Sequence, residues 1–257
     1  MKDIPILKFE YYEQLLKLRS LERESIIKKA QMGDEGRLDK YEDSAWEFAQ
    51  QEELGTSAQL IDLKYQISRL KIIEIDETVK PTVIQIGSFV KLKNINENTE
   101  KLYLIAGTNN EDRLSINSLL AKQLLGKKQD QTVEVITPQG FTKYFISEIQ
   151  WGVREYLKKY LPKYIQKEIS GVGKINLKVP LDDPEILKAP EDASRRDLVE
   201  VLQKKSYLEN IADKIEYIIA VTREYHLSIP ELDQCKLVLG KIKSLFEQFS
   251  IPYTSHF

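Results

Sequence analysis

The stretch Asp39-Lys40-Tyr41-Glu42-Asp43-Ser44-Ala45-Trp46 separates two segments that are rich in helix-forming residues. Residues 9–30 before it hold many Leu, Glu, Lys, Gln and Arg residues, and residues 44–70 after it carry apolar residues at three-to-four spacing. A narrow apolar stripe with charges on the other faces favours an antiparallel coiled coil. We therefore expect a helical hairpin over residues 1–78 with this stretch at its tip. In the first arm the apolar stripe consists of Tyr11, Leu15, Leu18, Ile26 and Ala30.

The tip carries two carboxylates, Asp39 and Glu42, which are three positions apart. Residues at this spacing share one face of a helical turn. Two carboxylates on one face are suitable ligands for Mg2+, which needs about six oxygen ligands and therefore further donors from elsewhere. The tip predicts half of a metal site, with Asp43 as a further candidate ligand and the remaining ligands on a partner. The alternative is an acidic turn that is only solvated.

After the hairpin the pattern changes from helical to β-prone. Residues 133–149 combine two β-prone runs with a Thr-Pro-Gln-Gly turn between them, which is a strong hairpin signal. A short helix is expected over residues 119–125, because a glycine follows it. Strands accompanied by one short helix predict a small α+β domain over residues 79–149.

Three motifs resemble those of a known family. The tip stretch resembles the Asp-x-x-Glu-Asn-Ala-Glu-Tyr motif that bacterial Gre transcript-cleavage factors carry at the tip of a coiled coil. Residues 114–128, Leu-Ser-Ile-Asn-Ser-Leu-Leu-Ala-Lys-Gln-Leu-Leu-Gly-Lys-Lys, resemble the family signature Ile-Ser-x-x-Ser-Pro-x-Ala-x-x-Leu-x-Gly-Lys-x. Residues 133–140, Val-Glu-Val-Ile-Thr-Pro-Gln-Gly, resemble its Val-x-Val-x-Thr-Pro-x-Gly hairpin. The likeness covers about residues 4–149, and Leu119 stands where the family has proline.

The resemblance implies an FKBP-like fold for residues 79–149 and a role in transcription. Members of the family reach through the secondary channel of bacterial RNA polymerase, which then cuts backtracked RNA at its own active site. Docking on the polymerase would involve Asn117, Ser118 and Leu119.

The resemblance also assigns the tip carboxylates a catalytic and metal-binding role. Asp39 and Glu42 would help to hold a Mg2+ ion that is shared with the polymerase, so that phosphodiester hydrolysis uses two metal ions. The chain would then not be an enzyme by itself, and it would bind no cofactor tightly alone.

Other charges near the tip leave alternatives open. Four basic residues are candidates for contact with the phosphates of the backtracked RNA 3′ end, or for a solvated helix face: Lys28, Lys29, Arg37 and Lys40. Four further acids resemble the multi-acid tip of a Gre relative that inhibits polymerase: Asp34, Glu35, Asp43 and Glu47. A Gre-fold inhibitor that occludes the secondary channel is therefore one alternative, and a coiled-coil adaptor or an FKBP-type prolyl isomerase are others, because fold does not determine function.

Residues 150–257 lie beyond the likeness. Apolar stripes predict helices over residues 151–166, 194–223 and 228–249, with a connector rich in Gly and Pro over residues 170–190. We expect a small helical bundle that folds by itself, and its sequence carries no catalytic motif.

Composition narrows the class of protein. The formal net charge of −2 argues against non-specific coating of nucleic acid. One cysteine and two histidines exclude a disulfide framework and a Cys/His zinc site within one chain. The N-terminal residues lack the apolar run of a signal peptide, and no apolar run has the length of a membrane span. We expect a cytoplasmic monomer.

Overall fold

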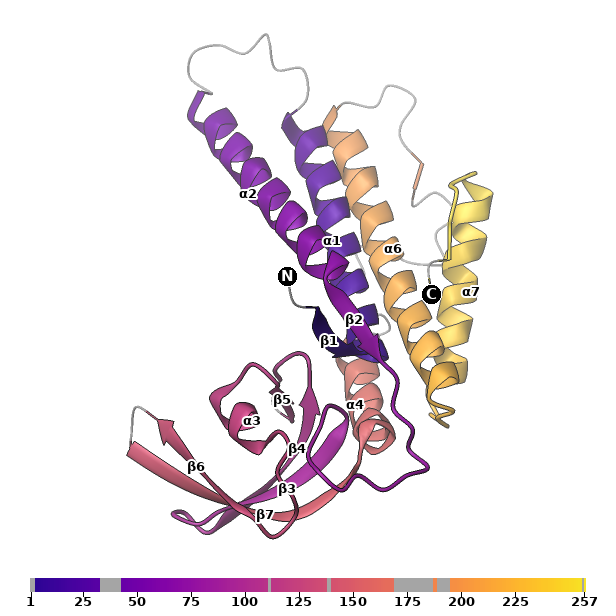
Figure 1. The fold of residues 1–257 in the computed structure, drawn as a ribbon. Helices are drawn as coiled ribbons and strands as arrows, with labels where there is room; N and C mark the ends of the chain where they lie inside the picture. The colour runs from indigo at the N-terminus through magenta and orange to yellow at the C-terminus, as the bar shows by residue number, and fades with distance from the viewer. Residues whose placement is uncertain are drawn as a thin grey trace. The chain divides into compact units, whose positions relative to one another are not determined.

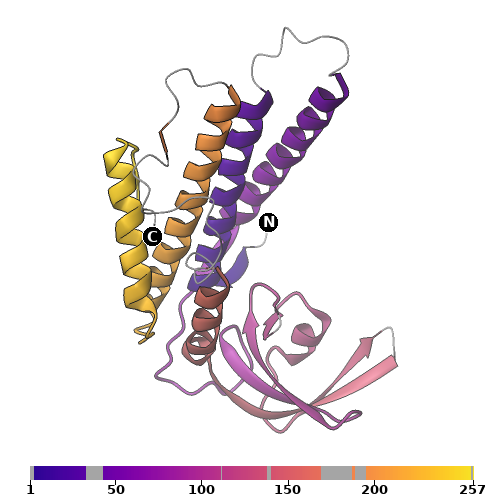
Figure 2. The same ribbon diagram turned by 180° about the vertical axis from the view of Figure 1, so that it is seen from behind.

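The fold was analysed in a computed structural model that describes residues 3–32, 43–110, 112–137, 140–168, 187–188, 195–255 and 257, with the backbone alone for residues 32, 43–49, 137, 195 and 196. These residues form a mixed α+β protein, as expected, with helices and a curled sheet (Figures 1 and 2). The chain divides into two compact units, residues 1–11 with 69–160 and residues 12–68 with 161–257. Each unit is described by itself below.

The first unit is built on a curled sheet. Among the described residues, five strands of this sheet pair in the order β5-β4-β3-β7-β6, and within it only the β4–β5 pair is parallel. The elements are β3 (Ser88–Asn94), β4 (Thr99–Ala106), β5 (Arg113–Ser115), α3 (Leu119–Leu124), β6 (Thr132–Thr137) and β7 (Gly140–Trp151). Buried apolar side chains from the sheet and α3 form one core, which includes Val90, Leu92, Ile105, Leu124, Ile146 and Ile149. The predicted helix and the predicted hairpin are both present.

The end of β7 corrects one predicted boundary. The sequence predicts a helix from Trp151, but Trp151 is the last residue of β7 and pairs with Ser88, and α4 spans Val153–Glu168. The junction between β7 and α4 requires glycine at position 152. Any larger residue would clash, because an added Cβ would lie 2.1 Å from Cβ of Phe89. Hydrophobic periodicity cannot detect this close approach, since the neighbour comes from a distant strand.

Two short strands that precede and follow the helical hairpin along the chain were not predicted from the sequence. Strands β1 (Ile4–Leu7) and β2 (Leu70–Ile73) pair in parallel, with Ile4 opposite Leu70. Ile6, Leu7 and Phe9 are at most 1% exposed, so this N-terminal segment belongs to the core of the first unit. Runs of four residues are too short for their periodicity to show a strand.

The second unit holds the predicted helical hairpin. Helices α1 (Lys8–Met32) and α2 (Asp43–Ser68) lie side by side and antiparallel, because Glu22 pairs with Lys64 at 2.9 Å and Lys29 with Glu53 at 3.5 Å. The seam is more polar than the sequence suggests. The predicted stripe residue Ile26 is 58% exposed, while the buried positions along these helices include Ser25, Glu53 and Thr56 as well as Leu63.

Helices from the C-terminal part complete the second unit. The helices are the C-terminal end of α4, α6 (Arg195–Glu224) and α7 (Leu232–Gln248). The core of α6 and α7 contains the buried residues Leu208, Ile211, Ile215, Tyr217, Ile218, Val221, Cys235, Leu239, Ile242 and Phe246. The predicted range 194–223 agrees closely with α6, whereas α7 begins at Leu232, after the predicted start at residue 228.

The compact units do not follow the three ranges expected from the sequence. Residues 1–11 group with the sheet, and residues 12–68 group with the C-terminal helices rather than standing alone. Contacts between α1 and α6 explain the grouping, and they are described below. Independent folding of residues 150–257 stays a prediction.

Candidate functional site

The start of α3 presents the three residues that the sequence analysis singled out for docking. We call Asn117, Ser118 and Leu119 the docking segment. The backbone of Ser118 is extended (φ −67°, ψ 153°), and its hydroxyl accepts a hydrogen bond from the Ala121 amide at 3.2 Å, so Ser118 caps the helix. Leu119 begins the helix and is 66% exposed. The cap therefore holds an apolar side chain out in solvent.

The departure from the family motif at Leu119 is compatible with this geometry. The first helical position is the one where proline is favoured, because its amide has no partner inside the helix. The first i→i−4 hydrogen bond of α3 is donated by the Lys122 amide to the Ser118 carbonyl at 3.0 Å. Leucine at position 119 thus leaves the cap intact and replaces a rigid ring by a longer apolar side chain.

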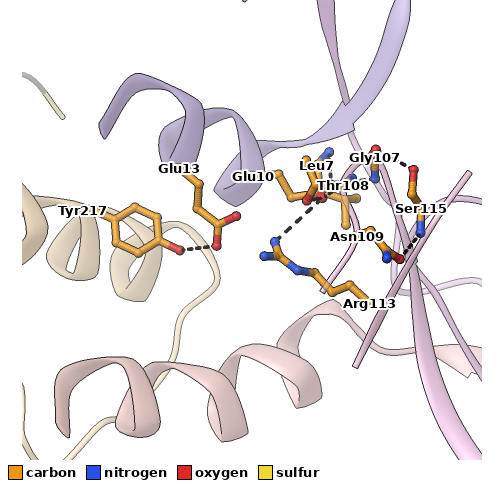
Figure 3. A network of polar contacts seen from close by, with 9 residues as sticks. All are labelled: Leu7, Glu10, Glu13, Gly107, Thr108, Asn109, Arg113, Ser115 and Tyr217. Atoms are coloured by element: carbon orange, nitrogen blue, oxygen red, sulfur yellow. Dashed lines mark hydrogen bonds and ion pairs between the residues drawn. The ribbon is translucent and has the colours of Figure 1, made fainter. Parts of the chain in front are cut away.

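A serine just before the docking segment connects it to a neighbouring loop. The Ser115 hydroxyl accepts a hydrogen bond from the Asn117 amide at 3.2 Å and donates one to the Gly107 carbonyl at 3.0 Å. The Ser118 amide donates to the Ser115 carbonyl at 2.9 Å. Residues 107–110 lie on the loop after β4, so Ser115 ties the docking segment to that loop (Figure 3).

The same loop is held by a buried carboxylate from the N-terminal segment. Glu10 is 0% exposed. Its carboxylate accepts hydrogen bonds from the amides of Gly107 at 2.9 Å, Thr108 at 2.8 Å and Leu7 at 3.1 Å, and from the Thr108 hydroxyl (Figure 3). Convergent donors of this kind hold a buried carboxylate in one orientation.

An arginine lies beside this carboxylate. Arg113 Nη1 is 3.8 Å from Glu10 Oε1, and the arginine side chain is 6% exposed. Its guanidinium lies 5.5 Å from the ring centre of Phe9, 5.8 Å from that of Tyr156 and 5.7 Å from that of Tyr160. The rings take the place of solvent around the cation and contribute cation–π attraction. Residues of β1, α1, β5 and α4 are thus joined within the first unit.

Glu10 and Arg113 are not among the site residues that the sequence predicts. Their only local signal is an acid in the first turn of a helix and a charged residue in a short strand, both of which are common on protein surfaces. Glu10 is separated from its loop partners by 97 and 98 positions, which places the pairing beyond any local pattern.

The predicted metal-binding tip of the hairpin lies almost entirely outside the described residues. Arg37, Asp39, Lys40 and Glu42 lie outside the described residues, and Asp43 is described by its backbone alone. Within the described part of the chain, no group of three or more His, Cys, Asp or Glu side chains is arranged to hold a metal ion. The tip therefore stays a prediction from the sequence.

The two basic residues of α1 that were proposed to contact RNA already contact protein. Lys28 lies 2.8 Å from the Glu24 carboxylate and donates to the Thr56 hydroxyl at 2.8 Å. Lys29 pairs with Glu53 at 3.5 Å, although its side chain is 61% exposed. Both lysines hold the hairpin together, and Lys29 remains the more accessible of the two.

A second buried carboxylate joins α1 to α6 in the second unit. Asp213 is 1% exposed and forms a charge-assisted hydrogen bond with Arg23. Arg23 also donates to the Asn210 side chain at 2.6 Å and lies 3.2 Å from Glu209. Arg19 lies 3.5 Å from the same aspartate. These residues lie on one face each of α1 and α6, so α6 runs along the first arm of the hairpin.

The central part of the chain matches a known protein family. The model for "Transcription elongation factor, GreA/GreB, C-term" matches residues 79–150. The chain is 34% identical over 146 residues to transcription elongation factor GreA of Bradyrhizobium diazoefficiens, 32% over 146 residues to that of Nitrobacter winogradskyi and 28% over 146 residues to that of Vibrio cholerae. These matches cover 90%, 89% and 90% of the relatives and 54%, 54% and 55% of this chain.

Two solved structures were also compared. GreA factor homolog 1 (Gfh1) of Thermus thermophilus is 23% identical, with 58% of this chain and 99% of that chain covered and a TM-score of 0.24. The GreA/GreB factor of Nitrosomonas europaea is 22% identical, with 36% and 79% covered and a TM-score of 0.26. Superpositions this poor carry no argument about the arrangement of the fold. The sequence matches are decisive, because relatives more than 30% identical are covered over most of their length: the chain belongs to the GreA/GreB family of transcription elongation factors.

Proposed function

We propose that this protein binds bacterial RNA polymerase at its secondary channel and stimulates cleavage of backtracked RNA. The observation that carries the proposal is the exposed docking segment at the start of α3, with Leu119 66% exposed, inside the region that matches the GreA/GreB family. Residues 79–149 would dock on the polymerase as an FKBP-like domain. Residues 1–78 would supply a coiled-coil hairpin that reaches the active site.

The proposed chemistry uses carboxylates that this chain lends to the polymerase. Asp39 and Glu42 would each present a hard oxygen donor, which suits Mg2+. The ion, when bound between the two proteins, stabilises the charge that develops on the phosphate during hydrolysis. The chain's own contribution is to carry the two side chains to the site and to hold them there. It acts as a monomer and is not an enzyme by itself.

The experiment adds the protein to a stalled, backtracked bacterial elongation complex and reads RNA length. The wild-type protein should shorten the RNA. Asp39→Asn and Glu42→Gln should each reduce cleavage about a hundredfold or more and leave polymerase affinity unchanged, because each keeps its shape and loses a metal ligand. The double variant should be little worse than either single variant, and higher Mg2+ should restore part of the activity.

A matched control keeps the result specific. Asp62→Asn makes the same change on α2 at an exposed aspartate whose carboxylate accepts a hydrogen bond from Gln66 at 2.7 Å. This variant should cleave as the wild type does. Equal loss in the control and in Asp39→Asn would mean that general acidity of the hairpin matters, and the assignment of a metal ligand would be withdrawn.

One observation favours a second candidate, inhibition of polymerase by occlusion of the same channel. The contacts of Arg19 and Arg23 with α6 place a third helix along the first arm. A three-helix arm is thicker than a bare hairpin and would fill more of a channel. Under this candidate the wild-type protein slows RNA synthesis without cleavage, and neutral tip variants relieve the inhibition. A wild-type protein that binds polymerase and does neither would defeat both candidates.

No helix within the described residues combines the length and the apolar character that crossing a membrane requires.

A further inference from the structure

The docking segment does not hold its conformation by itself. Its first amide, from Asn117, is bonded to the Ser115 hydroxyl, and the Ser118 amide is bonded to the Ser115 carbonyl at 2.9 Å. The Ile116 amide donates to the Ala106 carbonyl at 2.9 Å. The turn that presents Leu119 is therefore set by where Ser115 lies relative to the end of β4.

Ser115 pairs with Ala106 at the end of the β4–β5 ladder, and its polar groups also contact the loop after β4. Its hydroxyl donates to the Gly107 carbonyl at 3.0 Å, and its amide is 3.4 Å from the Asn109 side-chain oxygen. Within this loop the backbones of Asn110 and Arg113 bond to each other, and a side chain instead holds the amides of Gly107 and Thr108. The side chain that does so is Glu10, whose carboxylate accepts both the Gly107 and the Thr108 amides.

The position of Glu10 limits what it can do. At 0% exposure it cannot touch a partner protein or a nucleic acid, so any effect on docking must pass through the loop. The carboxylate bonds both the N-terminal segment and the loop after β4: Oε2 accepts from the amides of Leu7 and Gly107, and Oε1 accepts from that of Thr108. The carboxylate therefore locks the loop after β4 to the N-terminal segment that leads into α1.

We propose that Glu10 is the positioning residue for polymerase docking: through Gly107 and Ser115 it sets the conformation of the docking segment. This inference rests on the proposed function. It assigns to a residue outside the region matched by the family model a role in how that region meets its partner. Loss of the carboxylate does not change the docking side chains themselves, but it lets the turn that carries them sample other conformations. The apparent affinity then equals the intrinsic affinity multiplied by the fraction of molecules in the binding conformation.

The test replaces Glu10 by glutamine in the full-length protein. Glu10→Gln preserves size and turns one acceptor into a donor that faces amide N–H groups. The half-saturating concentration in the cleavage or inhibition assay should rise about tenfold, because bonds to a charged acceptor are lost from a buried loop. The maximal effect at saturating protein should not change, since the tip chemistry is untouched. Because a partly unfolded protein would produce the same split, denaturant unfolding followed by circular dichroism must show that Glu10→Gln is folded under the assay conditions.

A matched control lies one turn further along the same helix. Glu13→Gln makes the same chemical change at a residue that accepts a hydrogen bond from the Tyr217 hydroxyl at 3.4 Å, and Figure 3 shows both glutamates. This variant should keep the wild-type half-saturating concentration. Should Glu10→Gln fail to fold, Ser115→Ala tests the next link, because it removes the bonds to both Gly107 and Asn117 and leaves the Glu10 clamp intact.

The outcomes separate this inference from the proposed function. Leu119→Asp should weaken docking, and adding Glu10→Gln to it should cost less than Glu10→Gln costs alone, because the two residues act on one contact. If Leu119→Asp weakens binding and Glu10→Gln behaves like Glu13→Gln, the positioning role is wrong and docking stands. If the wild-type protein does not bind polymerase, or Leu119→Asp binds normally, the proposed docking itself is wrong.

Discussion

Two buried carboxylates, one in each unit, are held in opposite ways. Glu10 in the first unit is 0% exposed and accepts hydrogen bonds mainly from backbone amides, with Arg113 at 3.8 Å. Asp213 in the second unit is 1% exposed and faces the guanidinium groups of Arg23 and Arg19. Backbone donors fix the path of a loop, whereas arginine donors tie two helices together. The first arrangement therefore suits a binding segment, and the second suits a scaffold.

The contrast has an energetic consequence. When Glu10 is changed, the loop amides can turn toward water as the loop changes conformation, which limits the loss of stability. Two partly desolvated arginines lose a shared partner when the aspartate is removed, and Arg23 then keeps Glu209 and Asn210. Burial already lowers the pKa of Arg19, and Asp213 opposes that shift. Side-chain substitutions should therefore cost more at Asp213 than at Glu10.

The largest effect is expected from Asp213→Ala. Removing this carboxylate leaves Arg19 and Arg23 without it in a site where they are 17% and 14% exposed, and should lower the free energy of unfolding by about 3–5 kcal/mol. Denaturant unfolding followed by circular dichroism measures the change. Asp213→Asn is the control, since it keeps an oxygen acceptor and should lose less. A loss below about 1 kcal/mol would mean that the arginines find solvent or other partners.

The next prediction uses Cys235 to locate that loss. Cys235 is 1% exposed in the second unit, and burial raises the pKa of its thiol, so near neutral pH the folded protein holds less of the reactive thiolate than an unfolded chain does. Alkylation should be slow in the wild-type protein and about a hundredfold faster in Asp213→Ala, because the second unit opens more often. Glu10→Gln should leave the rate unchanged. Equal acceleration in both variants would show that the two units open together.

A smaller effect should separate the two arginines. Arg23→Met removes the charge-assisted hydrogen bond to Asp213 and should cost about 2–4 kcal/mol, since the buried carboxylate then keeps Arg19 at 3.5 Å but loses its stronger partner. Arg113→Met should cost about 1–2 kcal/mol, because Glu10 keeps its amide donors and methionine still packs against Phe9 and Tyr156. Unfolding free energies measured side by side would check the order. The reverse order would mean that the ion pair, and not the backbone, holds Glu10.

The smallest effect concerns the docking segment that Glu10 positions. Leu119→Pro restores the residue found in the family motif at the first position of α3, where Ser118 already has the extended backbone that a following proline requires. Stability should change by no more than about 1 kcal/mol. Lys122→Pro is the matched control and should cost about 3 kcal/mol or more, because it removes the bond to the Ser118 carbonyl. Thermal unfolding of both variants distinguishes them.

Local sequence accounted for the elements that depend on local order. The short helix α3, the hairpin of β6 and β7, and the long helices all follow from spacing within a few residues, and the structure has them close to where they were predicted. The predictions that differ are those where a distant partner decides. Ile26 fits an apolar stripe yet is 58% exposed, because α1 contacts its neighbours largely through charged and polar side chains.

The sequence by itself determined the family and most of the order of helices and strands, and it singled out the three residues of the docking segment. Motif spacing and hydrophobic period suffice for this because they are short-range properties of the chain. Only the tertiary structure decided that α1 packs against α6 as well as α2, and that Glu10 holds the loop to which Ser115 connects the docking segment. Asp213 meets Arg23 across 190 positions, and Glu10 meets Gly107 across 97. Such pairings depend on which surfaces the folded chain brings together, and periodicity within a short window carries no information about them.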